Sequence, residues 1–229
     1  MLYNPIHDIF IPFPYSIEDA HRAKSGNKEQ LQNELGLEIN SSVPMYGFVS
    51  RLTDQKGLSL IEKVLQSSPL LQHAQVIILG IGEKYWERRL KILADQRSKS
   101  LRVVTRFDEE LAHKIYAASD FILLPSKFEP CGLTQLIAMK YGSIPIVRKT
   151  GGLADTVINQ ISNPDRGTGL VFEKFTAREF SQVLGKSMGL YQQLDQFSAM
   201  QSRAMSKDFS WEASAQQYIQ LYKRMIDNT

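Results

Sequence analysis

The feature that most constrains the fold is an alternation of short apolar runs with longer amphipathic segments, which begins at Val43 and continues to Phe172. The apolar runs are continuous and rich in β-branched residues, so we expect strands that are covered on both faces. Right-handed crossovers between such strands give a doubly wound, Rossmann-like α/β domain with a parallel sheet. We expect strands at 45–49, 76–79, 101–104, 121–124, 144–147 and 170–172, and helices at 56–66, 85–97, 108–118, 133–141 and 153–158.

Two segments flank this region. Residues 1–42 are expected to form an irregular lead-in, because Pro5, Pro12 and Pro14 interrupt helices, followed by a short helix at 27–35. The chain after 172 should be helical. Its last part, 208–229, carries an apolar stripe at helical spacing that is wide enough to need a partner surface. The stripe consists of Trp211, Ala215, Tyr218, Ile219, Tyr222 and Met225.

The composition excludes several classes of function. The net charge is only +3 in 229 residues and shows no basic tract, so we expect no nucleic-acid partner. No apolar stretch approaches the ~20 residues of a membrane span, and the start of the chain does not resemble a signal peptide. The single cysteine, Cys131, rules out a disulfide within the chain and a cysteine zinc cluster, and it favours a reducing compartment.

The candidate chemistry lies where expected strands end, because ligands of open α/β sheets bind outside the carboxyl ends of the strands. Arg51 and Lys56 bracket the loop after the first core strand. Two cations at this spacing either converge on one diphosphate or form a solvated surface pair.

A second loop, after the strand at 121–124, contains Glu129, Cys131 and Gly132 before a helix. Gly132 allows close approach of the backbone to a ligand, and the free N–H groups at the start of the helix favour an anion. Glu129 can accept hydrogen bonds from sugar hydroxyls. The alternative is a simple Pro/Gly turn with an exposed glutamate.

Other signals are weaker. Gly151 and Gly152 either approach a phosphate or only begin a helix, and Phe107 either stacks on a nucleobase or belongs to the core. A glycine pair at 80–82 is not a dinucleotide-binding fingerprint. Cys131 has no evident base nearby and is expected to pack rather than react. No cluster of residues has the spacing of metal ligands.

These motifs resemble the donor-binding half of glycogen and starch synthases, which are retaining glycosyltransferases of the GT-B fold. The resemblance is carried by the motifs at 50–57 and 129–136, and by 140–145 and 150–157 after them. Tyr3, Asn4, Pro5 and Asp8 near the start and residues 208–211 near the end also match. The matches occur in the family's order and span nearly the whole chain.

The resemblance implies a donor-binding domain at 43–207 and a metal-independent reaction without a cofactor. Glucose would pass from ADP-glucose or UDP-glucose to the non-reducing end of an α-1,4-glucan. Arg51, Lys56 and Glu129 would be catalytic, the two cations on the diphosphate and Glu129 on glucose. The substrate-binding residues would be Phe107 against the base, with Cys131, Gly132, Leu133, Thr134, Gly151 and Gly152.

The chain also departs from the pattern. Ile137 stands where some related families carry a second glutamate, which argues against sucrose-synthase-like relatives. Nothing corresponds to the family's N-terminal domain, which carries most acceptor-side residues. We therefore expect a donor domain that is inactive alone and whose segment 208–229 crosses to the absent domain. The alternatives are a stand-alone nucleotide- or glycan-binding module and another GT-B enzyme. The implied compartment is the cytoplasm of a bacterium or, in a plant, the plastid.

Overall fold

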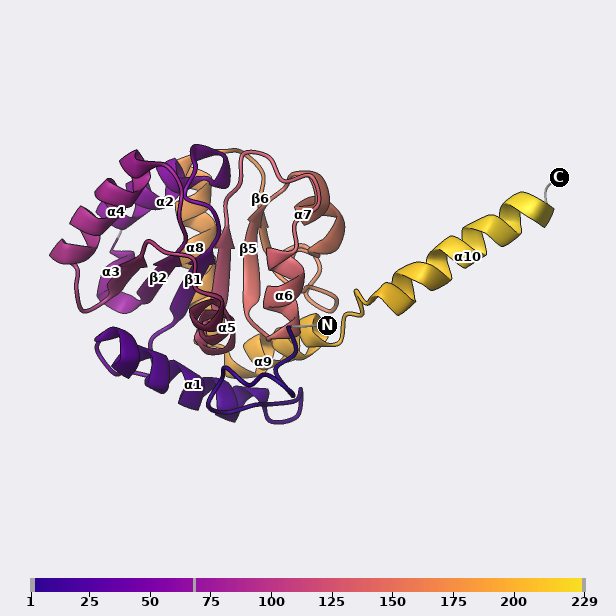
Figure 1. Ribbon diagram of the computed structural model, residues 1–229, viewed down its shortest axis with the longest axis horizontal. Coiled ribbons are helices and arrows are strands. Elements are labelled where there is room, and N and C mark those ends of the chain that lie inside the picture. Colours follow the sequence, from indigo (N-terminus) through magenta and orange to yellow (C-terminus); the bar gives the residue numbers. More distant parts are fainter. Residues whose placement is uncertain (1–2, 68, 228–229) are drawn as a thin grey trace.

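A six-stranded parallel sheet forms the centre of the molecule (Figure 1). The computed structural model describes residues 3–67 and 69–227. The strand order is β3-β2-β1-β4-β5-β6, so the expected doubly wound sheet is confirmed. The strands are β1 (Met45–Val49), β2 (Gln75–Leu79), β3 (Leu101–Val104), β4 (Phe121–Leu124), β5 (Ile144–Arg148) and β6 (Leu170–Phe172). They agree with the expected strands to within one residue.

The sheet order places a switch point at the centre. The chain runs outward from β1 through β2 to β3, and then returns to start the other half beside β1 at β4. The segments that follow β1 and β4 therefore leave in opposite directions, which opens the crevice where ligands of such sheets bind.

Helices cover both faces of the sheet. They are α1 (Ala20–Leu35), α2 (Leu58–Ser67), α3 (Leu70–His73), α4 (Lys84–Gln96), α5 (Glu109–Ala118), α6 (Thr134–Lys140), α7 (Gly151–Thr156), α8 (Ala177–Tyr191), α9 (Leu194–Met205) and α10 (Trp211–Asp227), with a 3₁₀ turn η1 (Asp54–Lys56) before α2. Successive strand residues alternate between two buried clusters. Phe121 and Leu123 join one cluster with α2, α4 and α8, whereas Ile122 and Leu124 join the other with α1, α5 and α7. The core is thus a three-layer sandwich.

The helix of the lead-in differs from the expectation. It begins at Ala20 rather than at 27, so it is longer than the sequence pattern indicates. The sequence pattern misses the first part of this helix because the buried face of the helix is largely polar. Lys24, Asn27, Lys28 and Gln32 are all buried beside Leu31. Apolar periodicity cannot reveal such a face. The helix packs along α5. Its Lys28 bonds to the carbonyl of Val43 and to Asp120, which lie just before β1 and β4, so the helix lies at the amino ends of these strands.

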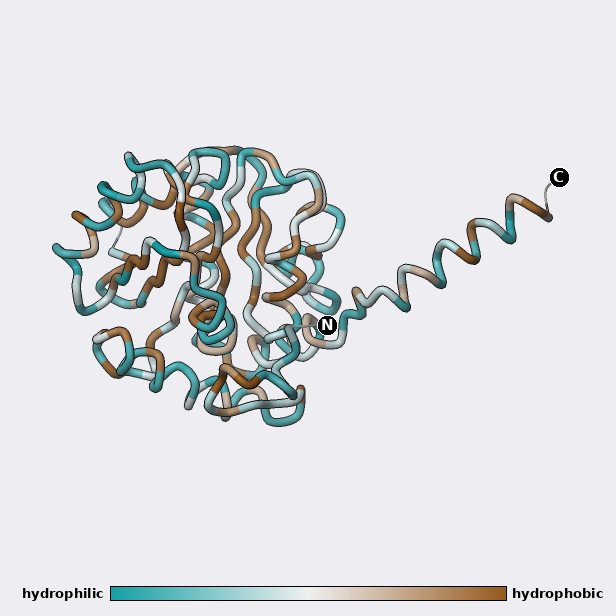
Figure 2. The backbone as a smooth tube through the Cα atoms, in the orientation of Figure 1, coloured by the Kyte–Doolittle hydropathy of each residue, from teal (hydrophilic) through white to brown (hydrophobic). Residues whose placement is uncertain are grey.

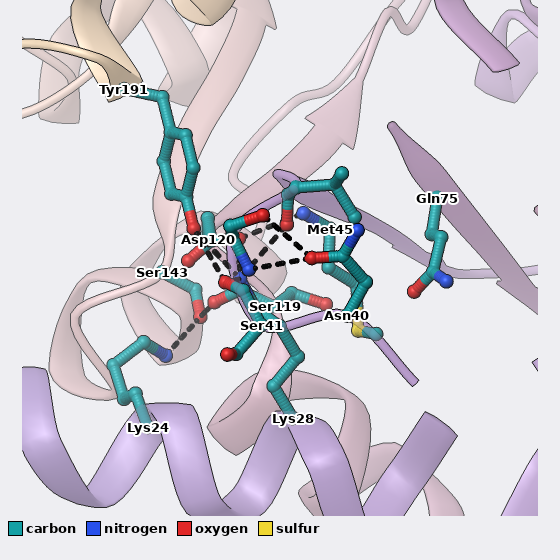
Figure 3. Close-up of polar contacts among 12 residues, drawn as sticks. Lys24, Lys28, Asn40, Ser41, Met45, Gln75, Ser119, Asp120, Ser143 and Tyr191 are labelled. Carbon is teal, nitrogen blue, oxygen red and sulfur yellow. Dashed lines mark hydrogen bonds and ion pairs between the residues drawn. The ribbon is translucent and has the colours of Figure 1, made fainter. Parts of the chain in front are cut away.

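Two lysines fasten α1 to the amino edge of the sheet (Figure 3). Lys28 Nζ lies 2.6 Å from Asp120 Oδ2 and donates to the hydroxyl of Tyr191 at 3.0 Å. Asp120 Oδ2 also accepts the backbone N–H of Met45 at 2.7 Å, which ties the start of β1 to the start of β4. Burial lowers the pKa of Lys28, but Asp120 and Tyr191 outweigh it and the pKa is raised.

Lys24 forms no ion pair within the part of the chain that the structure describes. Its Nζ donates to the carbonyls of Ala117 at 2.9 Å and Tyr141 at 3.0 Å, and to Ser143 Oγ at 2.9 Å. These carbonyls close the carboxyl ends of α5 and α6, where a positive charge is favourable. Burial nevertheless lowers the pKa of Lys24 to about 7, against the attraction of Asp120 and with the repulsion of Lys28.

The C-terminal part consists of helices, as expected. Thr176 Oγ1 accepts the N–H of Glu179 at 3.3 Å, which is one half of a capping box at the start of α8.

α8 and α9 pack on the sheet, but α10 projects away from the body of the molecule (Figure 1). Apolar and polar residues alternate along α10 (Figure 2). Trp211 is 87% exposed, and Tyr218, Tyr222 and Met225 are exposed as well. No helix in the described part of the chain has the length and apolarity needed to span a membrane.

Candidate functional site at the carboxyl edge of the sheet

An ion pair joins the two loops at the switch point. Lys56 Nζ, at the end of η1, lies 2.6 Å from Glu129 Oε2 in the loop after β4. The same carboxylate oxygen accepts the hydroxyl of Ser126 at 3.1 Å. Both members of the ion pair are largely buried, with 15% and 11% of their side chains exposed. Two of the three residues expected to be catalytic therefore lie in direct contact.

Backbone and side-chain contacts hold the two loops together around this pair. The N–H of Lys127 donates to the carbonyl of Gln55 at 2.8 Å, and the Gln55 amide donates to the carbonyl of Phe128 at 3.1 Å. An ion pair between Lys127 and Asp54 adds a third connection. Gly57 adopts φ +80°, and a Cβ there would lie 2.0 Å from the carbonyl oxygen of Pro125. Only glycine therefore allows η1 to approach the end of β4 this closely.

Arg148, the last residue of β5, supports the same loop from the other side. Its Nε donates to the carbonyl of Ser126 at 2.8 Å, and its Nη2 donates to the carbonyl of Lys127. The guanidinium thus fixes two successive carbonyls just before Glu129. This orients the loop that presents the glutamate.

The loop before α6 has free backbone donors. Gly132 adopts φ +76°, and Gln135 folds back so that its Nε2 donates to the carbonyls of Cys131 at 3.1 Å and Gly132 at 2.8 Å. The Gln135 side chain thus binds the carbonyls of this loop and leaves its backbone N–H groups unoccupied. Within residues 3–67 and 69–227, the N–H groups of Gly132, Leu133 and Thr134 have no acceptor. Unpaired donors at the start of a helix favour an anion.

The glycine pair after β5 packs against this loop. A Cβ on Gly151 would lie 2.1 Å from the carbonyl oxygen of Glu129, and one on Gly152 would lie 1.9 Å from that of Cys131. The N–H of Gly152 already donates to the carbonyls of Glu129 and Pro130, each at 3.1 Å. Gly151 is the first residue of α7. The two glycines therefore pack against the loop and support it, and the Gly152 N–H is already hydrogen-bonded to the protein.

Arg51 and Phe107 line a separate pocket of about 250 Å³. It lies between the ends of β1 and β2 and the start of α5, and Tyr3, Arg106 and Glu109 line it as well. Phe107 is 82% exposed, so it does not belong to the core. The Arg51 side chain is exposed and forms no ion pair or hydrogen bond within the described residues. The loop bearing Arg51 is held by the neighbouring glycines: a Cβ on Gly80 would lie 1.8 Å from the carbonyl oxygen of Ser50.

The remaining sequence candidates are on the surface. Leu133 is exposed, and Cys131 is an exposed free thiol, so the expectation that Cys131 packs is wrong. Among residues 3–67 and 69–227, no group of three His, Cys, Asp or Glu side chains has an arrangement that could hold a metal ion. The site thus combines two cations, one carboxylate and a row of free amides at one edge of the sheet. Such a set can bind an anionic group beside a hydroxylated one.

Sequence reasoning missed two of the residues that shape the site. Arg148 stands one position beyond the expected strand, where a cation reads as a surface residue. Gln135 falls within the motif at 129–136, but the motif does not indicate that its side chain is fully buried and fixes two loop carbonyls. Their positions in the sequence could have indicated a role, because Arg148 lies at the end of a strand and Gln135 lies close to a loop glycine at the carboxyl edge.

Comparison with known proteins identifies relatives of this chain. The protein-family model described as Glycosyl transferases group 1 matches residues 30–198. Glycogen synthase from Clostridium novyi is 41% identical over 97% of this chain and 46% of its own length. Glycogen synthase from Lactobacillus acidophilus is 44% identical over 98% of this chain and 47% of its own length. The chain thus spans about half the length of the curated relatives it matches.

Solved structures agree. The catalytic domain of starch synthase IV from Arabidopsis thaliana, bound to ADP and acarbose, aligns with a TM-score of 0.89 and 36% identity, over 98% of this chain and 47% of that one. A sucrose-phosphate synthase from Thermosynechococcus elongatus aligns with a TM-score of 0.63 at 23% identity, over 87% of this chain and 49% of that one, which shows a shared fold alone. These neighbours confirm that the sheet and its helices form one half of a GT-B fold. Since the family model covers most of its length, the chain belongs to the group 1 glycosyl transferases.

Proposed function

We propose that this chain binds the nucleotide-sugar donor of a glycogen or starch synthase. In that enzyme, glucose passes from ADP-glucose or UDP-glucose to the non-reducing end of an α-1,4-glucan with retention of configuration. The observation that carries the proposal is the set of groups at the switch point: the exposed Arg51, the Lys56–Glu129 pair and the free amides of the loop before α6. The likeness to glycogen synthases and to starch synthase IV supports it.

The two cations meet the diphosphate. Arg51 presents a planar fork, and Lys56 presents a point charge whose position is set by Glu129. Negative charge grows on the diphosphate as the bond to glucose breaks, so these groups stabilise the transition state more than the bound donor. In a retaining reaction the acceptor hydroxyl approaches the face that the diphosphate leaves, which makes charge stabilisation of the leaving group the main task. The proposed reaction uses no metal and no cofactor.

Glu129 holds the glucose, and the backbone holds the phosphates. The N–H groups of Gly132, Leu133 and Thr134 are free to donate to phosphate oxygens. The Gly152 amide is occupied, so Gly151 and Gly152 contribute by supporting the loop that contains Cys131. The Phe107 pocket lies next to Arg51 and receives the nucleobase.

The acceptor glucan is bound by the part of the relatives that this chain does not cover. The relatives are about twice as long, and a glucosyl transfer needs donor and acceptor held together in near-attack geometry. The donor-binding chain alone is therefore inactive in this proposal. The ADP in the starch synthase IV structure favours ADP-glucose as the donor.

A titration tests the proposal. The purified chain is titrated calorimetrically with ADP, UDP, ADP-glucose and UDP-glucose, and is assayed for incorporation of labelled glucose into glycogen. We expect binding of at least one nucleotide pair, ADP first, and no incorporation by the chain alone. Binding of glycogen without any nucleotide would favour a glycan-binding module. Robust incorporation by the chain alone would contradict the division of labour proposed here.

A further inference from the structure

The pocket beside Arg51 is lined partly by the lead-in and not only by the Rossmann-like core. Tyr3 borders it together with Phe107, while Val49 and Leu79 at the ends of β1 and β2 contribute apolar surface. We propose that Tyr3 forms an aromatic wall of the nucleobase pocket, so that the lead-in is a working part of the donor site. This inference rests on the proposed function, because it takes the ligand to be a nucleoside diphosphate.

The pocket has the size and lining of a base site. Its volume of about 250 Å³ corresponds to ~8 water molecules. That is the scale of a nucleobase ring system rather than of a whole nucleotide. Apolar strand ends with aromatic rings at the border suit a flat ring, since stacking on aromatic side chains is favourable for any base. Arg51 lies in the same lining and would lead from the base toward the diphosphate.

Stacking on a buried histidine fixes the Tyr3 ring. The rings of Tyr3 and His113 are nearly parallel, with centroids 4.2 Å apart and an interplanar angle of 12°. Tyr116 adds an edge contact at 6.0 Å. One face of Tyr3 is therefore covered by protein. A ring held in this way loses little freedom when a base packs against it.

A buried polar network anchors the histidine. His113 Nδ1 lies 2.7 Å from Asp8 Oδ2, and the hydroxyl of Tyr141 donates to the same oxygen at 2.5 Å. Asp8 belongs to the lead-in, His113 to α5, and Tyr141 follows α6 directly. The network thus joins the lead-in to two helices of the core. It explains how an irregular segment can hold Tyr3 at a defined position.

The Tyr3 hydroxyl is suited to donate a hydrogen bond. Burial raises the pKa of Tyr3, and the negative charges of Glu109 and Asp8 raise it further, so the hydroxyl stays protonated at neutral pH. A protonated phenol near the pocket can donate to a ring nitrogen or carbonyl of a base. Stacking remains the main contribution, and the hydroxyl is secondary.

The test compares ADP with inorganic pyrophosphate, which has the diphosphate but no base. Calorimetric titrations are run on the wild-type chain, Tyr3→Ala, Tyr3→Phe and the control Phe10→Ala. Phe10 packs edge-on against the same His113, with centroids 5.0 Å apart, but does not line the pocket. We expect Tyr3→Ala to weaken ADP about tenfold with pyrophosphate unchanged. Tyr3→Phe and Phe10→Ala should stay within about twofold of wild type.

The outcomes separate this inference from the function on which it rests. Wild-type binding of ADP with no loss in Tyr3→Ala overturns the role of Tyr3 and leaves the donor site standing. Equal losses for ADP and pyrophosphate, or for Tyr3→Ala and Phe10→Ala, also overturn it, because they show a general effect on the lead-in. Absence of any nucleotide binding by the wild type overturns both. A nuclear Overhauser contact between the Tyr3 ring and adenine protons, sought in the wild type, tests the inference even if Tyr3→Ala does not fold.

Discussion

The charged side chains at the two edges of the sheet differ in whether the protein itself supplies their partners. At the amino edge, Lys24, Lys28 and Asp120 are buried and their polar atoms are bonded to the protein (Figure 3). At the carboxyl edge, Arg51 is exposed and its side chain has no partner within the described residues, and the N–H groups of Gly132, Leu133 and Thr134 have no acceptor there either. A charge that the protein itself satisfies contributes to architecture, whereas a charge left open is available to a ligand. The contrast predicts that variants at one edge change stability and variants at the other change binding.

The largest effect is expected from Asp120→Ala. It leaves Lys28 buried without its counter-ion and Met45 without its acceptor, and removing one partner of a buried pair costs about 3–5 kcal/mol. Urea unfolding of the chain measures this loss. Glu173→Ala is the matched control, because its pair with Lys149 is exposed on both sides and should contribute about 0–1 kcal/mol. The double variant Lys28→Met with Asp120→Ala should recover part of the loss. Equal midpoints for Asp120→Ala and wild type would break the comparison.

The next effect belongs to the carboxyl edge. Arg51→Ala and Lys56→Ala should each weaken ADP binding to the chain. In the whole enzyme each should also lower kcat, through a loss of transition-state stabilisation on the order of 2–4 kcal/mol. The unfolding free energy of Arg51→Ala should stay near the wild-type value because this side chain is exposed, whereas Lys56→Ala should also lose stability because it leaves the largely buried Glu129 without its partner. Calorimetry and urea unfolding on the same samples check both halves of this statement. If the ADP affinity and kcat of both variants stay within threefold of wild type, these cations do not bind the diphosphate.

A pH dependence sharpens the amino-edge half of the comparison. The pKa of Lys24 is about 7 in the folded chain, whereas an unfolded lysine titrates near its ordinary 10.5. Between these values the unfolded chain binds more protons, so stability relative to a variant without this group rises with pH, by about 1.4 kcal/mol per unit at most. Unfolding of wild type and Lys24→Met at pH 6, 8 and 9.5 measures the difference. Parallel curves over this range would show that Lys24 keeps its charge.

The smallest effect concerns Phe107. Phe107→Ala should weaken nucleoside diphosphate binding by about 1–3 kcal/mol, while Phe107→Tyr should be tolerated. Because this side chain is largely exposed, neither variant should change the unfolding free energy by more than about 0.5 kcal/mol. A loss of stability together with unchanged affinity would reassign Phe107 from the pocket to the architecture.

The sequence predicted the sheet well because its strands are continuous apolar runs, and such runs require burial on both faces. It did not predict the extent of α1, since the buried face of that helix consists of lysine, asparagine and glutamine. A lysine in a sequence reads as a solvated residue until its acceptors are known, and those of Lys24 come from residues 116–143. The amino-edge network was therefore out of reach of pattern reasoning.

The site was predictable in part. The strand-end rule located Arg51, Lys56, Glu129 and Gly132 at one edge, and the structure brings Lys56 and Glu129 into contact. Their roles toward a donor stay predictions until a ligand is measured. The support from Arg148 and Gln135 depends on side chains folding back onto loop carbonyls, which spacing along the chain does not reveal.

The stripe on 208–229 was also predicted, and along α10 its large residues are exposed. An exposed apolar surface of this kind needs a partner. The expectation that the segment crosses to another domain remains a prediction. In the chain alone we expect the segment to be mobile or to mediate self-association. Concentration-dependent sedimentation of the chain, compared with Trp211→Ser, addresses the self-association.

Hydrogen exchange with and without ADP tests the central claim most directly, because it reads both edges in one experiment. The amides of Gly132, Leu133 and Thr134 have no acceptor among the residues that the structure describes, and they should exchange fast until phosphate oxygens accept them. With saturating ADP we expect slower exchange at 50–57, 105–109 and 129–136, unchanged exchange at the amino-edge segments 43–45 and 119–121, and no response in Lys56→Ala at the same ADP concentration. Saturating ADP that leaves 129–136 unchanged, or that protects the amino edge instead, would contradict the assignment of the donor site to the carboxyl edge.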